Sequence, residues 1–301
     1  MKRFIMKTIL FFAVLIALDA ACGVLFGRLV NTAKGGDTYL SNYICSKMKD
    51  ECVIFGSSRG MHHYDPNIIG DSLGMSCWNC SLDGNGIILM YGRYKMMSER
   101  YAPKVLVYDV CTSFDLLDGD DNKHLLRLRY FYDRPGIDSI FWNVDKTERI
   151  KMLSNFYRYN SLWVQIVSDN IHPLQQNVKG YKPMDTSMTY EPKKKDTEKT
   201  EYRYDSLKLF YLEKLVVDCK KKGTRLVFAI SPMYRMTDDS VYEPLKEICR
   251  KYKVLLINHY CDKRFVNTRE YFSDSVHMNR TGATKYSKLL VEELKDIMKQ
   301  K

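Results

Sequence analysis

The chain has 301 residues, of which 45% are hydrophobic and 13% aromatic, so it can bury a core and is not a disordered, collagen-like or disulfide-stapled miniprotein. Its net charge of +11 at pH 7 favours acidic neighbours such as phospholipid head groups, anionic glycans or nucleic acid. The basic residues are spread along the whole chain, however, without zinc-finger spacing or a basic region leading into heptads. We therefore expect no nucleic-acid partner.

The first thirty residues predict a membrane anchor. An apolar run of 18 residues extends from Ile9 to Phe26 and is interrupted by Asp19. Its basic flanks are Lys2, Arg3, Lys7, Arg28 and Lys34. The run is close to the ~20 residues that span a bilayer and exceeds the ~7–15 of a cleavable signal. We predict one uncleaved transmembrane helix in residues 1–30, with residues 31–301 on the extracytoplasmic (periplasmic) side of the inner or plasma membrane.

Two alternatives for this segment stay open. The first is cleavage after Ala20-Ala21, which would make the run a signal sequence. The second is lipidation at Cys22, although Asp19 stands where a lipobox has an aliphatic residue.

Beyond the anchor, short apolar runs alternate with helical patterns. The predicted strands are Cys52–Gly56, Met75–Cys80, Val105–Val110, Arg225–Ser231 and Val254–Asn258. Helices are predicted from Asp65-Pro66, from Ile87 to Met97, from Leu209 to Cys219, over Val241–Tyr252 and from about Asn279. This alternation predicts an α/β fold, a three-layer parallel sheet with helices on both faces, whose ligand site lies at the carboxyl ends of the strands.

Residues 117–202 break the alternation and are predicted to be an insertion. Leu125–Tyr132 and Thr147–Val167 are rich in aromatic residues and predicted to be helical. Gln175–Thr200 is polar, charged and without periodicity, which predicts a flexible connector. We therefore expect residues 31–301 to form one α/β domain that carries this helical insertion.

Three segments at predicted strand or helix ends carry residues suited to acyl transfer. They are Gly56-Ser57-Ser58 after the first strand, Asn79–Gly84 after the second, and Asp274–His277 before the final helix. A serine nucleophile needs an imidazole as its base, the imidazole needs a carboxylate, and the developing oxyanion needs N–H donors. An Asp and a His three residues apart, on a loop leading into a helix, can both face the serine.

On these motifs the chain resembles the SGNH (GDSL-type) hydrolase family, over most of residues 50–118 and 203–300. The family's Gly-Asp-Ser block is similar to Gly56–Ser58, which implies Ser58 as nucleophile. Its Asp-x-x-His block matches Asp274 and His277 and completes a Ser-His-Asp triad. The resemblance also implies an SGNH-hydrolase, flavodoxin-like fold without a cofactor.

The same resemblance implies an oxyanion site. The family's Asn-x-x-x-x-Gly block matches Asn79–Gly84, which implies the N–H of Gly84 as a donor beside that of Ser58. The Gly-x-Asn-Asp block falls at Val110–Ser113, where the Asn is missing and Thr112 or Ser113 is the substitute. One lost donor can cost ~10²–10³ in rate.

Three residues after the nucleophile are predicted to bind substrate. Arg59 could bind a carboxylate or phosphate, and His62 or His63 could bind a sugar hydroxyl; the alternative is packing and capping. Adjacent histidines near Asp65 on an irregular turn do not predict a metal site. Cys77-Trp-Asn-Cys80 is predicted to be structural, because it lies in an apolar strand and lacks the helix N-terminus that activates a thiol.

A single anchor followed by such a domain resembles the accessory proteins of bacterial envelope acylation, which work beside membrane-bound O-acyltransferases. This implies an acyl-ester hydrolase or O-acyl (acetyl) transferase that acts on a cell-envelope glycan. A plain esterase or deacetylase is one alternative. The other is a catalytically silent binding or scaffold partner of a membrane O-acyltransferase, which the missing Asn favours and the Ser-His-Asp set opposes.

Overall fold

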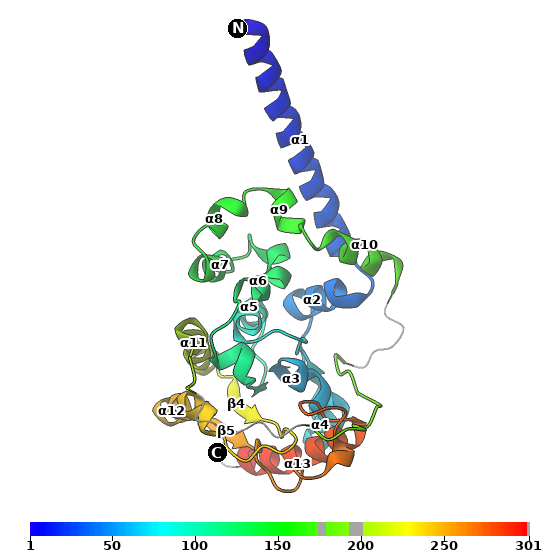
Figure 1. Ribbon diagram of the computed structural model, residues 1–301, viewed down its shortest axis with the longest axis vertical. Helices are drawn as coiled ribbons and strands as arrows, with labels where there is room; N and C mark the ends of the chain where they lie inside the picture. Colours follow the sequence, from blue (N-terminus) through cyan, green and yellow to red (C-terminus); the bar gives the residue numbers. More distant parts are fainter. Residues whose placement is uncertain (174–178, 193–200, 300–301) are drawn as a thin grey trace. The chain divides into compact units, whose positions relative to one another are not determined.

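The computed structural model describes residues 1–173, 179–192 and 201–299 (Figure 1). The chain divides into a helical unit, Met1–Lys47 with Leu125–Gln176, and a sheet unit, Met48–His124 with Asn177–Lys301. Only the second half of the N-terminal helix packs against residues of the insertion. The predicted domain boundaries at residues 30, 117 and 202 stay a prediction.

The sheet unit contains a five-stranded parallel sheet. Its strands are β1 (Cys52–Gly56), β2 (Cys77–Asn79), β3 (Val105–Asp109), β4 (Arg225–Ile230) and β5 (Leu255–Asn258). Their order is β2-β1-β3-β4-β5, and every pairing is parallel. This is the flavodoxin-like order, whose topological switch point lies between β1 and β3. The predicted α/β class is confirmed.

Helices cover both faces of the sheet (Figure 1). One face is covered by α4 (Pro66–Leu73) and α13 (Arg280–Lys299), the other by α5 (Ile87–Ser98), α11 (Ser206–Lys222) and α12 (Glu243–Tyr252). Alternate strand residues point to opposite faces. Ile54, Val107 and Val227 therefore join one core with Tyr286 and Leu290 of α13.

On the other face, the rings of Phe55, Tyr108 and Phe228 contact one another edge to face, with centroids 6.3 and 6.0 Å apart. Asp205 caps the start of α11 by accepting from the Leu207 amide at 2.8 Å, and Gly223 ends the helix with a φ of 75°. Glycine adopts such a φ without strain, so the helix ends at Lys222, beyond the predicted Cys219.

Short helices complete the sheet unit. They are α3 (Ser58–His63), α6 (Asn122–Leu125), the π-helix η1 (Thr112–Leu116) and the 3₁₀ helices η3 (Ser240–Tyr242) and η4 (Arg269–Tyr271). Two of them, α3 and η1, begin just past the ends of β1 and β3. They therefore lie at the carboxyl ends of the two strands that flank the switch point.

The helical unit is built on α1 (Lys2–Thr32), which is long and apolar enough to cross a membrane. The unit also contains α2 (Gly36–Ser46), the 3₁₀ helix η2 (Leu126–Phe131), α7 (Asp138–Val144), α8 (Glu148–Lys151), α9 (Asn155–Tyr159) and α10 (Trp163–Ile171). The segment Thr147–Val167, which was predicted to be helical, thus contains three short helices. Ser154 caps a new helix start, and Ser161 has a φ of 65°, which no helix interior accommodates.

The predicted connector Gln175–Thr200 lies partly outside the described residues, since residues 174–178 and 193–200 are not described. Residues 179–192 are held firmly within the sheet unit. The Lys182 amide donates to the Met61 carbonyl at 3.3 Å, and the Met188 amide donates to the Phe272 carbonyl at 2.8 Å. Tyr181 and Met188 are buried in its core. The prediction of a flexible connector is wrong for this stretch.

Candidate active site

The two serines after β1 lie in different surroundings. Gly56 ends the strand, Ser57 is the N-cap of α3, and Ser58 is the first residue of that helix. The Ser57 residue is 0% exposed, whereas Ser58 is half-buried. Of the pair, Ser58 is therefore the one whose hydroxyl a substrate can reach.

Ser58, His277 and Asp274 are hydrogen-bonded in sequence. The Ser58 Oγ lies 2.8 Å from Nε2 of His277, and the Asp274 Oδ2 lies 2.9 Å from the other ring nitrogen, Nδ1. A proton on Nδ1, directed at the carboxylate, leaves the Nε2 lone pair free to accept the serine proton. The three residues thus have the geometry of nucleophile, base and orienting acid.

Asp274 is held by its own loop. Its Oδ1 accepts from the amides of Val276 and His277, both at 2.8 Å. Burial would raise the pKa of Asp274, but the bonds from His277 and from these amides outweigh burial and lower it to about 2. The carboxylate is therefore ionised at neutral pH, as the orientation of an imidazole requires.

His63 holds the backbone that follows His277 by a hydrogen bond. Its Nε2 accepts from the Met278 amide at 2.8 Å, so the ring proton is on Nδ1, which donates to the Ser231 Oγ at 2.9 Å. Burial, together with the nearby Arg59 and His277, moves the pKa of His63 well below its usual range. Because His63 is completely buried, the expectation that it contacts substrate is corrected: it positions the segment that follows His277.

Arg59 is also part of the framework. It is 1% exposed, and it donates to the carbonyls of Val110 at 2.5 Å and Ser231 at 3.3 Å, beside Asp109 at 3.5 Å. Burial opposes its charge, but Tyr242 and Asp109 outweigh burial and raise the pKa of Arg59 well above its usual value. Its guanidinium joins the ends of β3 and β4 instead of binding substrate, which corrects the second expectation.

His62 lies next to His277. The two rings meet edge to face, with centroids 5.4 Å apart. The His62 Nδ1 is 2.5 Å from the Lys182 carbonyl oxygen, and its Nε2 is 3.1 Å from Asp83. Burial lowers the pKa of His62, yet the bond to Asp83 and that to Lys182 outweigh burial and raise it. Both ring nitrogens face acceptors, so a protonated ring is favoured; substrate binding by His62 remains a prediction.

The predicted oxyanion residues lie on loops beyond the ends of β2 and β3. Gly84 has a φ of 67°, and a Cβ added there would meet nothing within 4 Å, so its backbone borders open space. Thr112 is the first residue of η1, and Ser113 follows it in an exposed position. Whether Gly84, Thr112 and the Ser58 amide bind an oxyanion stays a prediction.

Asn79 and Asp115 fix these loops, and sequence reasoning missed both roles. The Asn79 side chain donates to the carbonyls of Gly60 and Tyr64 at 2.8 and 3.0 Å. Asp115 accepts from the amides of Cys111 and Ile87, both at 2.6 Å, and burial raises its pKa to about 7. The sequence signal for Asp115 was its position between Phe114 and Leu116, since a carboxylate among apolar residues is often buried and hydrogen-bonded.

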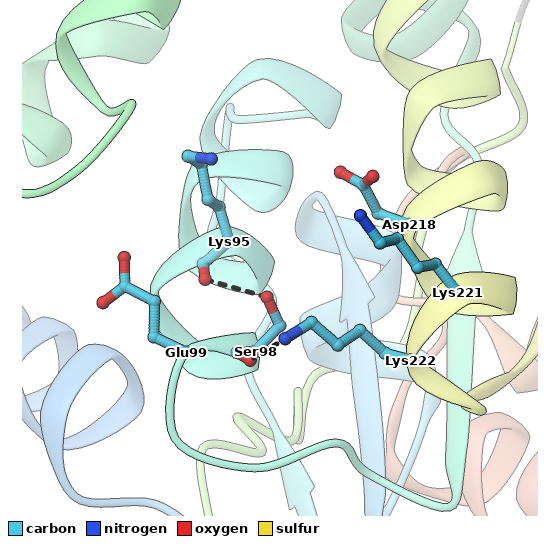
Figure 2. Close-up of a pocket in the computed structure, with 6 residues that line it drawn as sticks. All are labelled: Lys95, Ser98, Glu99, Asp218, Lys221 and Lys222. Carbon is cyan, nitrogen blue, oxygen red and sulfur yellow. Dashed lines mark hydrogen bonds between the residues drawn. The ribbon is translucent and has the colours of Figure 1, made fainter.

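Among the described residues, no three His, Cys, Asp or Glu side chains are grouped so that they could hold a metal ion. A separate hollow of about 260 Å³ lies between the ends of α5 and α11 (Figure 2). It is lined by Lys95, Ser98, Glu99, Asp218, Lys221 and Lys222. These helix ends precede β3 and β4, so the hollow is at the amino edge of the sheet, opposite Ser58.

Comparisons with known proteins give the following. The chain is similar to a solved structure from Bacteroides fragilis, named as a candidate acylhydrolase, at a TM-score of 0.44 and 11% identity over 87% of this chain and 97% of that one. It is also similar to a solved structure from Streptococcus pneumoniae, named as a candidate platelet activating factor. The TM-score is 0.39 and the sequence identity 13%, over 96% of this chain and 98% of that one. No family model and no curated protein matches the chain.

The sheet order and the position of the serine define the class on their own. Ser58 follows the strand at the topological switch point, and the His277 loop precedes the last helix. The structure is thus an α/β protein with the flavodoxin-like sheet order, and the SGNH-type family remains what its motifs resemble.

Proposed function

We propose that the chain is a serine acyl-ester enzyme, a hydrolase or O-acyl (acetyl) transferase, attached to a membrane by α1. One observation carries the proposal: Ser58 Oγ lies 2.8 Å from His277 Nε2 while Asp274 lies 2.9 Å from Nδ1. The three groups meet where a parallel sheet of this order binds its ligands. Ser58 is the partly exposed member of the Ser57-Ser58 pair, which agrees with the role of nucleophile.

In the first half-reaction Ser58 Oγ attacks the carbonyl carbon of an ester. His277 Nε2 takes the hydroxyl proton, and Asp274 stabilises the imidazolium that forms. The negative charge on the carbonyl oxygen would be held by the amides of Ser58 and Gly84, with Thr112 as a third donor. Collapse of the tetrahedral intermediate breaks the ester bond. The leaving alcohol takes the proton from His277, and an acyl-Ser58 enzyme remains.

In the second half-reaction a hydroxyl group attacks the acyl-enzyme. His277 removes its proton and returns it to Ser58, so the same residues serve hydrolysis, with water, and transfer, with a sugar hydroxyl. The basic residues that precede the apolar part of α1 favour an N-in anchor. We therefore propose an acylated envelope glycan as substrate and a membrane O-acyltransferase as partner, with the sheet unit outside the cytoplasm.

An active-site-directed fluorophosphonate tests the nucleophile directly. The full-length protein in detergent is incubated with the probe, and the labelled peptide is identified by mass spectrometry. We expect a single adduct on Ser58, absent in Ser58→Ala and present in Ser57→Ala, whose hydroxyl is buried. If the folded protein forms no adduct on Ser58, the enzyme proposal fails and the scaffold alternative takes its place.

A second assay separates hydrolysis from transfer. A p-nitrophenyl acyl ester is supplied with and without a glycan acceptor, and both free acid and acylated glycan are measured. Acylated glycan that depends on Ser58 supports a transferase. Free acid at the same rate with and without acceptor supports the plain esterase.

A further inference from the structure

The insertion exposes an unusual set of apolar side chains. They are Ile150 (73% exposed), Leu153 (80%), Phe156 (52%), Trp163 (56%), Val164 (59%), Val167 (38%) and Ile171 (65%). Those of α10 recur at a spacing that places them on one face of the helix, while Ile166 between them is buried. A group of exposed large apolar side chains of this kind marks a surface that contacts something other than water.

The start of α9 is hydrogen-bonded to Asp19 of α1. The carboxylate of Asp19 accepts from the Ser154 hydroxyl at 2.7 Å, from the amides of Asn155 and Phe156 at 3.0 and 2.9 Å, and from the Asn155 side chain at 2.9 Å. Further along, the rings of Phe26 and Tyr159 stack with centroids 5.5 Å apart. Within the helical unit, α9 and α10 therefore lie beside the second half of α1 (Figure 1).

The length of α1 sets the depth of this attachment. Between Lys7 and Arg28 its only charged residue is Asp19, and this stretch of about 20 residues covers roughly 30 Å, the thickness of a bilayer's hydrocarbon core. The exposed part before Asp19, from Phe4 to Leu18, covers only about 22 Å. If α1 spans the membrane, Asp19 must lie inside the hydrocarbon boundary, about 12 Å along the helix from Gly27.

We infer that α8, α9 and α10 form a second membrane contact, with their exposed apolar side chains among the lipids of the leaflet that surrounds the second half of α1. The start of α9 is bonded to Asp19, so these helices enter the membrane boundary together with α1. A carboxylate at that depth is costly unless it is satisfied, and α9 supplies four donors. The inference rests on the membrane-spanning role of α1 in the proposed function.

Lipid is the occupant that fits this surface. Helices α9 and α10 contact α1, whose exposed apolar surface the proposed function assigns to lipid, and Trp163 is a residue type enriched at membrane interfaces. The amphipathic α10, one face buried on the unit and the other apolar and exposed, has the form of a helix that lies in the interfacial plane.

Quenching of tryptophan fluorescence by brominated lipids tests the inference. The full chain is reconstituted into phosphatidylcholine–phosphatidylglycerol vesicles whose acyl chains carry bromine either near the glycerol or near the methyl end. We expect stronger quenching by the shallow label, most of it lost in Trp163→Phe and kept in Trp142→Phe, since Trp142 is half-buried between Arg149 and Tyr132. Val164→Trp in the Trp163→Phe chain should restore the quenching from the same exposed face.

Equal quenching of the unmodified and Trp163→Phe chains would overturn the inference, and so would failure of Val164→Trp to restore it. Resistance of the chain to alkaline extraction from the vesicles is measured in parallel. A resistant chain with unquenched Trp163 leaves the anchor intact and refutes only the second contact. A chain that alkali extracts refutes the anchor and the inference with it.

Discussion

The two units of this chain differ in how many large apolar side chains they expose. The sheet unit buries charged and polar groups completely, among them Arg59, His63, Asp109 and Asp115. Among the described residues, the sheet unit exposes four large apolar side chains, Tyr190, Phe210, Val217 and Leu255. The helical unit instead exposes apolar side chains along α1 and from α8 to α10. In the proposed function, the sheet unit carries the reaction site and the helical unit carries the surface that contacts lipid.

The difference follows from what each unit must hold in place. In the sheet unit the buried groups hydrogen-bond the strand ends to the loops that carry Ser58 and His277, so the triad sits on a rigid base. In the helical unit a partly buried polar contact joins Asp19 to the start of α9 and so holds α9 against α1. Variants that act on one unit and spare the other test this division.

The largest effect is expected for Ser58→Ala. Loss of the nucleophile should lower kcat for ester turnover by at least ~10⁴-fold, because no neighbouring group can form the acyl-enzyme. Ser57→Ala should change kcat only a few-fold. Vesicle association should be the same in both variants and in the unmodified chain. Unchanged turnover in Ser58→Ala would show that Ser58 is not the nucleophile and that the reaction site does not lie at this end of the sheet.

Asp274→Asn is expected to come next, with kcat reduced by ~10³–10⁴-fold, since the amide no longer fixes the His277 tautomer. Its stability effect has a defined pH window. The folded pKa is lowered from 3.8 to about 2, so the carboxylate stabilises the fold above pH 3.8 and loses this contribution as the pH falls through 2.

Acid unfolding followed by circular dichroism measures this window. The unmodified chain should lose stability between these pH values more steeply than Asp274→Asn. Identical slopes would mean that Asp274 is not bonded to the His277 loop in solution.

Arg59→Met should destabilise the protein by about 3–5 kcal/mol, because it leaves the buried Asp109 carboxylate without its cation. Hydrogen exchange resolved by peptide locates the effect. We expect faster exchange in β1, β3 and β4, and unchanged exchange in α10 of the helical unit. A variant that folds normally but has a raised KM would instead reinstate Arg59 as a substrate-binding residue.

Much of the sheet unit could be predicted from the sequence because its signals are local. Buried parallel strands form continuous apolar runs, and the residues after Gly56 and before Asn279 carry the chemistry in chain order. The three predicted groups accordingly lie within hydrogen-bond distance. The sequence could not separate Arg59 and His63 from substrate-facing residues, because their partners, Val110, Ser231 and Met278, are distant in the chain.

The helical unit was harder to predict for the same physical reason. Its apolar pattern is satisfied in part by α1, which ends at Thr32, far before Leu125 in the chain. Periodicity within the insertion alone could therefore not locate the breaks at Ser154 and Ser161. Helix α2 was not predicted at all. Its N-cap makes no side-chain hydrogen bond, and two of its buried residues, Thr38 and Ser41, are polar. The sequence therefore lacks the apolar periodicity that usually identifies a helix.

The smallest effect is expected at the pair beside the triad, His62 and Asp83. The pKa of His62 is raised above 6.5 although burial opposes it, so its pairing with Asp83 stabilises the fold fully below pH 6.5 and loses this contribution as the pH rises through the raised pKa. Asp83 is half-exposed, which limits the contribution to under about 1 kcal/mol.

Asp83→Asn should therefore lower the pKa of His62, which is measured from the NMR chemical shift of a His62 ring carbon as a function of pH. The same variant should flatten the decline of stability between neutral and mildly alkaline pH. The buried His63 serves as the internal control, since its pKa lies well below this range and its signal should stay that of a neutral ring in both chains. An unchanged His62 titration in Asp83→Asn would show that the Lys182 carbonyl, and not Asp83, sets the charge of this ring.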